Sequence, residues 1–543
     1  MVGEGSYYAQ SFLPIIVTTT VTGGASGASV RVRSRAAAMA AFRDQSIIVV
    51  EGRMLHDEDV LIDKDIIKRA KMRTMFALNL AFLLEKTNEQ VLPAAYKFIG
   101  YSLNVNPSQL GSITLARGLV QALTSPVAGL LGDRLNRCYV VSFGAILWGV
   151  MTVAIACSTN LAQAMSYSAV NGLGLALVIP ASQSLVADYY EEKSRGGAFG
   201  LLFGFSSLGG LAGGFFATSI GGLHPLGLEG WRFAFHVVAG ISVAAGLTVL
   251  AIARDPRRKA THMMDEGTGG FLRWLGKHAR EMGRDIGLVL RIPTFNIVVL
   301  QGIVGTAPWI AMGWLTLYLQ LVGFSDLAAA VLNALMALGC ALGSYCGGLL
   351  GDALTKYYSP NRGKIIAAQL SVATAIPFTI ALLKLMPMTA TAESFSKYAA
   401  VLFFMGSCIS WSGTNNSAMF SEIVPEQLRS AIYAFDRSFE GAVGATAAPL
   451  VGIIADRVFG YRGAVGHEAD PALQAANANA LGNSLMAVLG VPWFLCFCAY
   501  FLLYFTLPID KRKSIMLGRQ LAAQKSERAV ELGDTQPRSI API

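Results

Sequence analysis

The sequence predicts an all-α membrane protein whose twelve transmembrane helices form two pseudo-symmetric six-helix bundles. The chain has 543 residues, of which 53% are hydrophobic and only 14% charged, whereas soluble proteins carry about 25% charged residues. Its apolar residues fall into consecutive stretches of membrane-spanning length. In addition, the pentapeptide Gly-Leu-Leu-Gly-Asp occurs at 129–133 and again at 348–352. This repeat indicates two related halves.

The twelve predicted spans are each long enough, as a helix, to cross a hydrocarbon core of about 30 Å. Several contain a Gly, a Pro or a charged residue, so the prediction depends on the series rather than on any single span. They are 74–101, 109–131, 139–158, 163–187, 197–220, 232–253, 295–321, 328–350, 365–386, 398–420, 430–455 and 483–507.

The net charge of +9 is distributed unevenly between the loops. The segment 254–294 holds nine Lys and Arg residues. The loops on the other side of the predicted membrane contain no Lys or Arg in five cases, 102–108, 159–162, 222–230, 323–327 and 387–396. Only the last of these loops, 457–481, contains any. This positive-inside pattern predicts that both termini are cytoplasmic. No basic surface with interleaved aromatic residues is present, which argues against nucleic-acid binding. The seven cysteines show no metal-site or disulfide spacing, so we expect neither a metal nor a cofactor.

The charge pattern also divides the chain into five parts. We expect an N-terminal extension at 1–72, which is transit-like or disordered at first and then charged, because residues 5–43 contain Arg but no Asp or Glu. Two six-helix bundles at 73–253 and 295–508 flank a cytoplasmic linker at 254–294. The polar segment 509–543 is expected to be a disordered cytoplasmic tail.

The loop between the second and third spans carries a recognisable motif. Gly129 permits a close helix approach, and Asp133, Arg134 and Arg137 place one carboxylate and two guanidinium groups at the cytoplasmic edge. Such charges can stabilise one arrangement of two bundles by pairing with Arg or with a helix N-terminus. The second copy of the repeat lacks the two closely following arginines.

With this motif between its second and third spans, the chain resembles the major facilitator superfamily over about residues 73–508. The superfamily motif G-x-x-x-D-R-x-G-R-[RK] is matched except at Asn136, where Gly is usual, and at Cys138, where a base is usual. The resemblance implies two bundles around a central cavity that opens alternately to each side.

The motif variant G-D-R-x-N-R also resembles the spinster-like branch of that superfamily. Further matching pieces lie at 172–180, 195–200, 231–235, 424–429 and 449–452. Two positions depart from the branch, because Leu175 stands where a Glu is usual and Ser168 where an Arg is usual.

Charged residues inside the first span are costly unless they are paired or hydrated. Glu85, Lys86 and Glu89 lie within one helical turn of each other. One base between two acids leaves a carboxylate that can bind and release a proton. We expect this group to couple transport to protons or to contact substrate, and the alternative is that it only lines water.

The eleventh span repeats the acid-base-x-x-acid pattern as Asp436, Arg437 and Glu440. In the superfamily the second and eleventh spans face each other. Arg117 in the second span could therefore meet these residues and form a gate between the bundles. A permanent ion pair that only orders packing is the alternative.

A further set of polar and aromatic residues lies in the seventh and tenth spans, which line the cavity in the superfamily. Each is as well explained by helix packing as by ligand contact. They are Gln301, Trp309, Trp314, Asn415 and Asn416.

Together these features predict a secondary active transporter that works by alternating access, is driven by protons and carries a small organic or amphipathic, lipid-like solute. No nucleotide-binding G-x-x-x-x-G-K-[ST] loop is present, and the six dispersed histidines form no catalytic constellation. An uncoupled uniporter and a membrane sensor or receptor on a transporter fold stay open as alternatives. We expect a monomeric multi-pass protein, whose membrane (plasma membrane, vacuole or lysosome, or plastid envelope) the sequence leaves open.

Overall fold

The computed structural model describes residues 48–50, 53–55, 57–190, 192–256, 287, 290–359, 362–423, 438–463, 465 and 470–531. Within these ranges, side chains are left undescribed at 48–67, 129–130, 132–134, 187, 192–200, 418, 420–423, 514–515 and 517–531.

The first half of the chain forms a group of helices that pack on one another. Helix α4 packs on α6, α2 on α7, and α5 on both α6 and α8. The helices are α2 (Asp57–Ala94), α3 (Tyr96–Leu103), α4 (Pro107–Arg134), α5 (Arg137–Ala156), α6 (Leu161–Tyr189), α7 (Glu192–Gly221), the short η2 (Pro225–Gly227) and α8 (Gly230–Ile252). A small antiparallel hairpin, β1 (Ile48–Val50) and β2 (Arg53–Leu55), precedes them.

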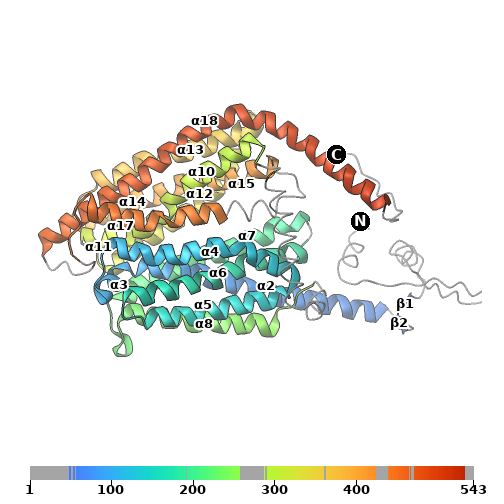
Figure 1. Ribbon diagram of the computed structural model, residues 1–543, viewed down its shortest axis with the longest axis horizontal. Helices are drawn as coiled ribbons and strands as arrows, with labels where there is room; N and C mark the ends of the chain where they lie inside the picture. Colours follow the sequence, from blue (N-terminus) through green and yellow to red (C-terminus); the bar gives the residue numbers. More distant parts are fainter. Residues whose placement is uncertain are drawn as a thin grey trace, which may run out of the picture.

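The second half forms a second group beside the first (Figure 1). Here α12 packs on α14, and α10 and α13 pack on α18. Its elements are α10 (Pro293–Ala311), η3 (Met312–Trp314), α11 (Leu315–Val322), α12 (Asp326–Tyr357), α13 (Gly363–Ile380), η4 (Ala381–Leu385), α14 (Ala392–Ile409), α15 (Trp411–Ile423), α17 (Ala447–Arg457) and α18 (Pro471–Glu531).

The predicted all-α membrane fold is confirmed. Nine helical stretches among the described residues are long and apolar enough to cross a membrane. The other three predicted spans are helical as well: 74–101 lies in α2 and α3, 109–131 in α4, and 398–420 in α14 and α15. Of the predicted span 430–455, the part from 438 is described.

The structure differs from expectation at both ends of the chain. The tail predicted to be disordered from residue 509 continues α18 as helix to Glu531, because it is rich in Lys, Arg, Gln, Glu, Ala and Leu, which favour helix. The β1–β2 hairpin lies in the 1–72 extension, for which the sequence predicted no strands. Figure 1 shows the start of α2 and the end of α18 projecting beyond the bundles at the same end of the molecule.

Local sequence signals set several helix starts. Asn106 caps α4, since its side chain accepts a hydrogen bond from Gln109 N while the Gln109 side chain accepts one from Asn106 N, both at 3.0 Å. Pro107 follows at the first helical position, where its missing N–H costs nothing. The Ser325 side chain caps α12 in a similar way. These caps lie at the same end of the molecule and fix where the loops there give way to helix.

The two halves meet mainly where α4 packs on α17 and where α7 packs on α12. Glycines allow the first of these contacts. A Cβ at Gly111 would overlap the backbone of Ala448 and Pro449, and a Cβ at Gly452 would overlap the backbone of Pro107 and Ser108. Small residues let helix backbones approach closely in a membrane, where van der Waals contact is a principal driving force for association.

We predict that Gly111→Leu forces α4 away from α17. Overpacking of a tight contact costs about 1–3 kcal/mol, so the detergent-purified variant should unfold at a lower temperature than wild type. Gly214→Leu is the matched control, because a Cβ at Gly214 meets nothing within 4 Å. Equal melting temperatures for the two variants would show that the α4–α17 contact tolerates separation.

Candidate functional site

A cluster of four charged residues lies in the interior of the first bundle. Glu85, Lys86 and Glu89 come from α2, and Arg117 comes from α4. Glu85 lies eleven residues after Thr74, or about 17 Å along the helix, which places the cluster near the middle of the predicted span. Glu85 and Arg117 are 4% and 7% exposed.

The contacts in this cluster pair its charges. Lys86 Nζ donates to Glu89 Oε2 at 2.5 Å, and the two side chains stay 37% and 32% exposed. Arg117 Nη1 donates to the Glu89 carbonyl oxygen at 3.1 Å, and its guanidinium lies within electrostatic range of both carboxylates. The structure therefore adds a second base to the acid-base-acid group that the sequence predicts. The cluster thus contains two acids and two bases. Glu85 and Arg117 are buried, whereas Lys86 and Glu89 are accessible.

A buried hydrogen-bond network adjoins the charged cluster. Asn88 Nδ2 donates to Thr152 Oγ1 at 2.9 Å, and Asn171 Nδ2 donates to the same oxygen at 3.0 Å and to the Trp148 carbonyl at 3.0 Å. The network ties α2 to α5 and α6. These bonds hold the face of α2 next to Glu85 and Glu89 in place. The sequence analysis did not predict the network, because single Asn and Thr residues in apolar spans have no distinctive spacing.

The predicted gate is only partly described. Asp436 and Arg437 lie outside the described residues, so their pairing with Arg117 stays a prediction. Glu440 approaches α10 so closely that a Cβ at Gly302 would overlap its carboxylate. Arg117, for its part, is bonded to the backbone of α2.

The remaining sequence-predicted cavity residues divide into buried and accessible ones. Asn416 Nδ2 donates to Gln301 Oε1 at 2.7 Å, and Asn416 Oδ1 accepts from the Tyr500 hydroxyl at 2.8 Å. Asn415 Nδ2 donates to two backbone carbonyls. Trp314 is fully buried, whereas Trp309 is 42% exposed. The contacts of Gln301, Asn415 and Asn416 are those of packing residues that tie α10, α12, α15 and α18 together.

The two bundles are fastened at one end, which we call the closed end. It is formed by α3, residues 104–106, the start of α12, residues 456–463 and residue 465. Lys97 Nζ donates to Asp326 Oδ1 at 3.1 Å across the bundles, and Gln320 Nε2 donates to the same atom at 3.0 Å. Ser108 N donates to Asp456 Oδ2 at 3.0 Å. Val465 N donates to the Val105 carbonyl at 3.0 Å.

Aromatic packing reinforces the closed end. The rings of Tyr96 and Trp314 lie 4.5 Å apart, centroid to centroid, across the two bundles. The Trp314 indole N–H donates to the Ala448 carbonyl at 3.2 Å, and Tyr96 and Thr114 share a 2.5 Å hydrogen bond. One hydrophobic cluster runs without interruption through both bundles here, whereas a second cluster is confined to the first bundle. Trp314 thus belongs to the contact between the bundles.

These fastening residues went unrecognised in the sequence. Lys97 lies near the C-terminal end of the first predicted span and Asp326 just before the N-terminal end of the eighth, so both are next to loops without Lys or Arg. The signal available for this ion pair was that two opposite charges lie at the same predicted membrane boundary, in different halves of the chain. The sequence alone could not show that they meet.

At the opposite end, the motif loop is described in part. Gly129, Asp133 and Arg134 have undescribed side chains, so their contacts stay a prediction. Arg137 is fully buried and donates to Asp255 through Nε at 3.0 Å and Nη2 at 2.5 Å. Its Nη1 lies 2.8 Å from Asp188 Oδ2 and donates to Ser184 Oγ at 2.9 Å. Arg137 therefore joins the start of α5 to the ends of α6 and α8.

A sequence profile of the Major Facilitator Superfamily matches residues 78–449. The chain belongs to this superfamily. Members are membrane transporters, so the protein is a multi-pass membrane protein of a transporter family rather than of an enzyme family. The superfamily resemblance predicted from the motif loop is confirmed.

Similar sequences match only part of this chain. The quinolone resistance protein NorA of Staphylococcus aureus (strain N315) is 25% identical over 171 residues, which are 32% of this chain and 42% of NorA. The probable vesicular acetylcholine transporter-A of Danio rerio is 28% identical over 187 residues, or 34% of this chain and 36% of that protein. The matches thus span less than half the length of these relatives.

Similar solved structures cover most of the chain. A bacterial homolog of the human lysosomal transporter Spinster, in an inward-facing and unoccupied conformation, gives a TM-score of 0.66 at 21% identity over 82% of this chain and 98% of that one. A D-xylose-proton symporter gives a TM-score of 0.59 at 14% identity over 81% and 98%. At such identities the likeness supports the fold.

We predict that Arg137→Gln strongly destabilises the protein. Removing one partner of a buried ion pair leaves an uncompensated charge and costs about 3–5 kcal/mol, because Asp255 is only 3% exposed. Thermal unfolding of the purified variant measures the effect, and Arg512→Gln on exposed α18 is the control. A wild-type melting temperature for Arg137→Gln would contradict the role of this contact.

Proposed function

We propose that this chain is a proton-coupled secondary active transporter of a small organic or amphipathic solute, working by alternating access. The charged cluster of Glu85, Lys86, Glu89 and Arg117 is the observation that supports it. Ionisable groups in the middle of a membrane are expensive and usually mark substrate or ion pathways. The accessible Lys86–Glu89 pair would receive the solute or proton, and buried Glu85 would hold the proton during the conformational change.

The conformational part of the proposal depends on the closed end. Bundles that are fastened at one end and separate at the other give one state of an alternating-access cycle. We propose that the closed end faces away from the cytoplasm and that the structure is an inward-facing state. The positive-inside charge pattern and the likeness to an inward-facing neighbour support this assignment.

An uncoupled uniporter is the second candidate, and one observation favours it. With Arg117 included, two acids are balanced by two bases, so the cluster can stay charged throughout the cycle. A uniporter would use these charges only to hold water or substrate. The two candidates therefore differ in whether a carboxylate changes its protonation state.

Transport by proteoliposomes with an imposed pH gradient separates the candidates. Because related proteins are named for quinolone resistance and for acetylcholine transport, a quinolone and acetylcholine are suitable first probes, with a pH-sensitive dye trapped inside the vesicles. Accumulation together with dye response supports the coupled transporter, and equilibration without accumulation supports the uniporter. Saturable binding of a probe without flux supports the sensor.

We predict that Glu85→Gln and Glu89→Gln each abolish gradient-driven accumulation while solute exchange persists, because exchange needs no net protonation. Radiolabelled uptake with and without the gradient measures both activities. Glu393→Gln is the control, since Glu393 is exposed and pairs only with Lys397 among the described residues. Normal accumulation by both α2 variants would exclude these carboxylates from coupling.

We also predict that Lys97→Gln or Asp326→Asn loosens the closed end. Each removes the ion pair between α3 and α12, so residues 96–112 should exchange their amide hydrogens faster. Hydrogen–deuterium exchange read by mass spectrometry is the measurement. The double variant should resemble either single one, because both lose the same contact, whereas unchanged exchange in all three would contradict a fastening role.

A further inference from the structure

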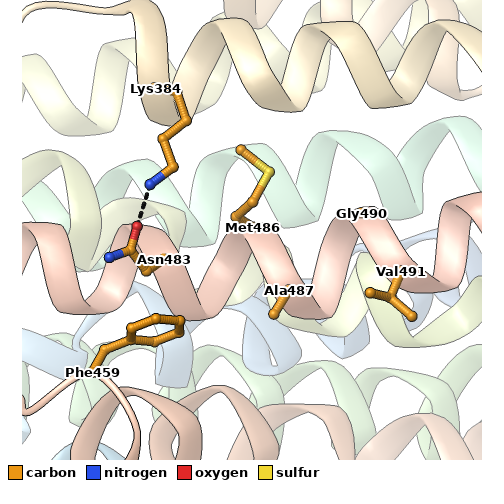
Figure 2. Close-up of a pocket in the computed structure, with 7 residues that line it drawn as sticks. All are labelled: Lys384, Phe459, Asn483, Met486, Ala487, Gly490 and Val491. Atoms are coloured by element: carbon orange, nitrogen blue, oxygen red, sulfur yellow. Dashed lines mark hydrogen bonds between the residues drawn. The ribbon is translucent and has the colours of Figure 1, made fainter.

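A groove lies on the outside of the second bundle, away from the charged cluster. It lies between η4, residues 483–491 of α18 and Phe459, two residues after the end of α17, and its volume is about 470 Å³. Figure 2 shows the side chains around it. Its lining residues are Lys384, Phe459, Asn483, Met486, Ala487, Gly490 and Val491.

The groove has one cationic end and one apolar end. Lys384 Nζ donates to Asn483 Oδ1, and Figure 2 shows the two side chains pointing toward each other at one end of the groove. Gly490 and Val491 lie seven and eight residues farther along α18, which is about 10–12 Å along the helix. Between them, Met486 and Ala487 present thioether and methyl groups only.

The position of Lys384 along its helix places the cation near the end of a candidate membrane span. Lys384 is next to the end of the candidate membrane span Gly363–Leu385, so its ammonium group is close to the membrane boundary. Large apolar side chains around the groove, such as Leu385 at 70% and Val491 at 58% exposure, face outward. In a membrane protein such a face is covered by acyl chains.

Lys384 has capacity for an anionic ligand. An ammonium group has three donors, and the hydrogen bond to Asn483 uses one. No carboxylate among the described residues pairs with it. The amide of Asn483 holds the ammonium group at the mouth of the groove without neutralising its charge.

From this polarity we propose that the groove binds an anionic phospholipid of the surrounding bilayer, with its phosphate on Lys384 and part of an acyl chain along Met486, Ala487 and Gly490. An ammonium group forms charge-assisted hydrogen bonds to phosphate, and the apolar side chains beyond it can pack against an alkyl chain. The site is separate from the proposed transport pathway and does not depend on it.

Native mass spectrometry of the full-length protein tests the proposal. The purified protein would be incubated with an equimolar mixture of phosphatidylglycerol and phosphatidylcholine of identical acyl chains, and the retained lipids counted. The wild-type protein should retain more phosphatidylglycerol than phosphatidylcholine. Lys384→Gln should lose the preference, because glutamine keeps a hydrogen-bond donor but not the charge.

A second variant and two controls separate the groove from general surface charge. Gly490→Leu should reduce retention of both lipids by filling the groove, and it should fold, since a Cβ at Gly490 meets only Met486 Sδ, at 4.0 Å. Lys397→Gln removes another exposed lysine, on α14, and should keep the preference, as should Gly214→Leu. Equal retention of the two lipids by wild type, or an intact preference in Lys384→Gln, would overturn the proposal.

Discussion

The close contact between α4 and α17 determines how the two bundles meet. In a bilayer, lipid tails solvate apolar side chains as well as another helix does, so helices associate through close van der Waals fit and hydrogen bonds. Gly111 and Gly452 bring the two backbones together. That approach in turn allows Tyr96 to stack on Trp314 and Lys97 to reach Asp326. The hydrophobic cluster that spans both halves follows from the same approach.

The charged cluster in the first bundle has requirements that differ from those of the packed closed end. Four ionisable side chains inside the bundle require pairing and some contact with water. The exposure of Lys86 and Glu89 supplies the contact with water, and the network of Asn88, Thr152 and Asn171 holds α2 in place beside them. A rigid, packed end and a hydrated, charged middle are therefore complementary parts of one arrangement.

Much of the fold could be predicted from the sequence, whereas much of the site could not. Apolar stretches, basic loops and the repeated pentapeptide predicted the membrane fold, because each is a local property of the chain. Glu85, Lys86 and Glu89 were also identifiable, since charges inside an apolar span are conspicuous. The gate role of Arg117 stays a prediction, but its hydrogen bond to the Glu89 carbonyl oxygen could not be foreseen, because the direction of a side chain depends on helix rotation that hydropathy does not define. The contact of Lys97 with Asp326 joins residues far apart in the chain, and no local pattern specifies such a pair.

The contact of Asp456 with the start of α4 affects how the two bundles can move apart. Asp456 belongs to α17, yet its carboxylate accepts a hydrogen bond from the N–H of Ser108, which is the first N–H of α4 in the other bundle because Pro107 has none. A free N–H at a helix start is satisfied by a cap or by water, and a carboxylate there is favoured by the helix dipole. If the bundles part at this end, both groups lose their partner at once, and only water can replace it. Separation is therefore also a hydration step, so the cost of opening depends on how readily water enters between α4 and α17.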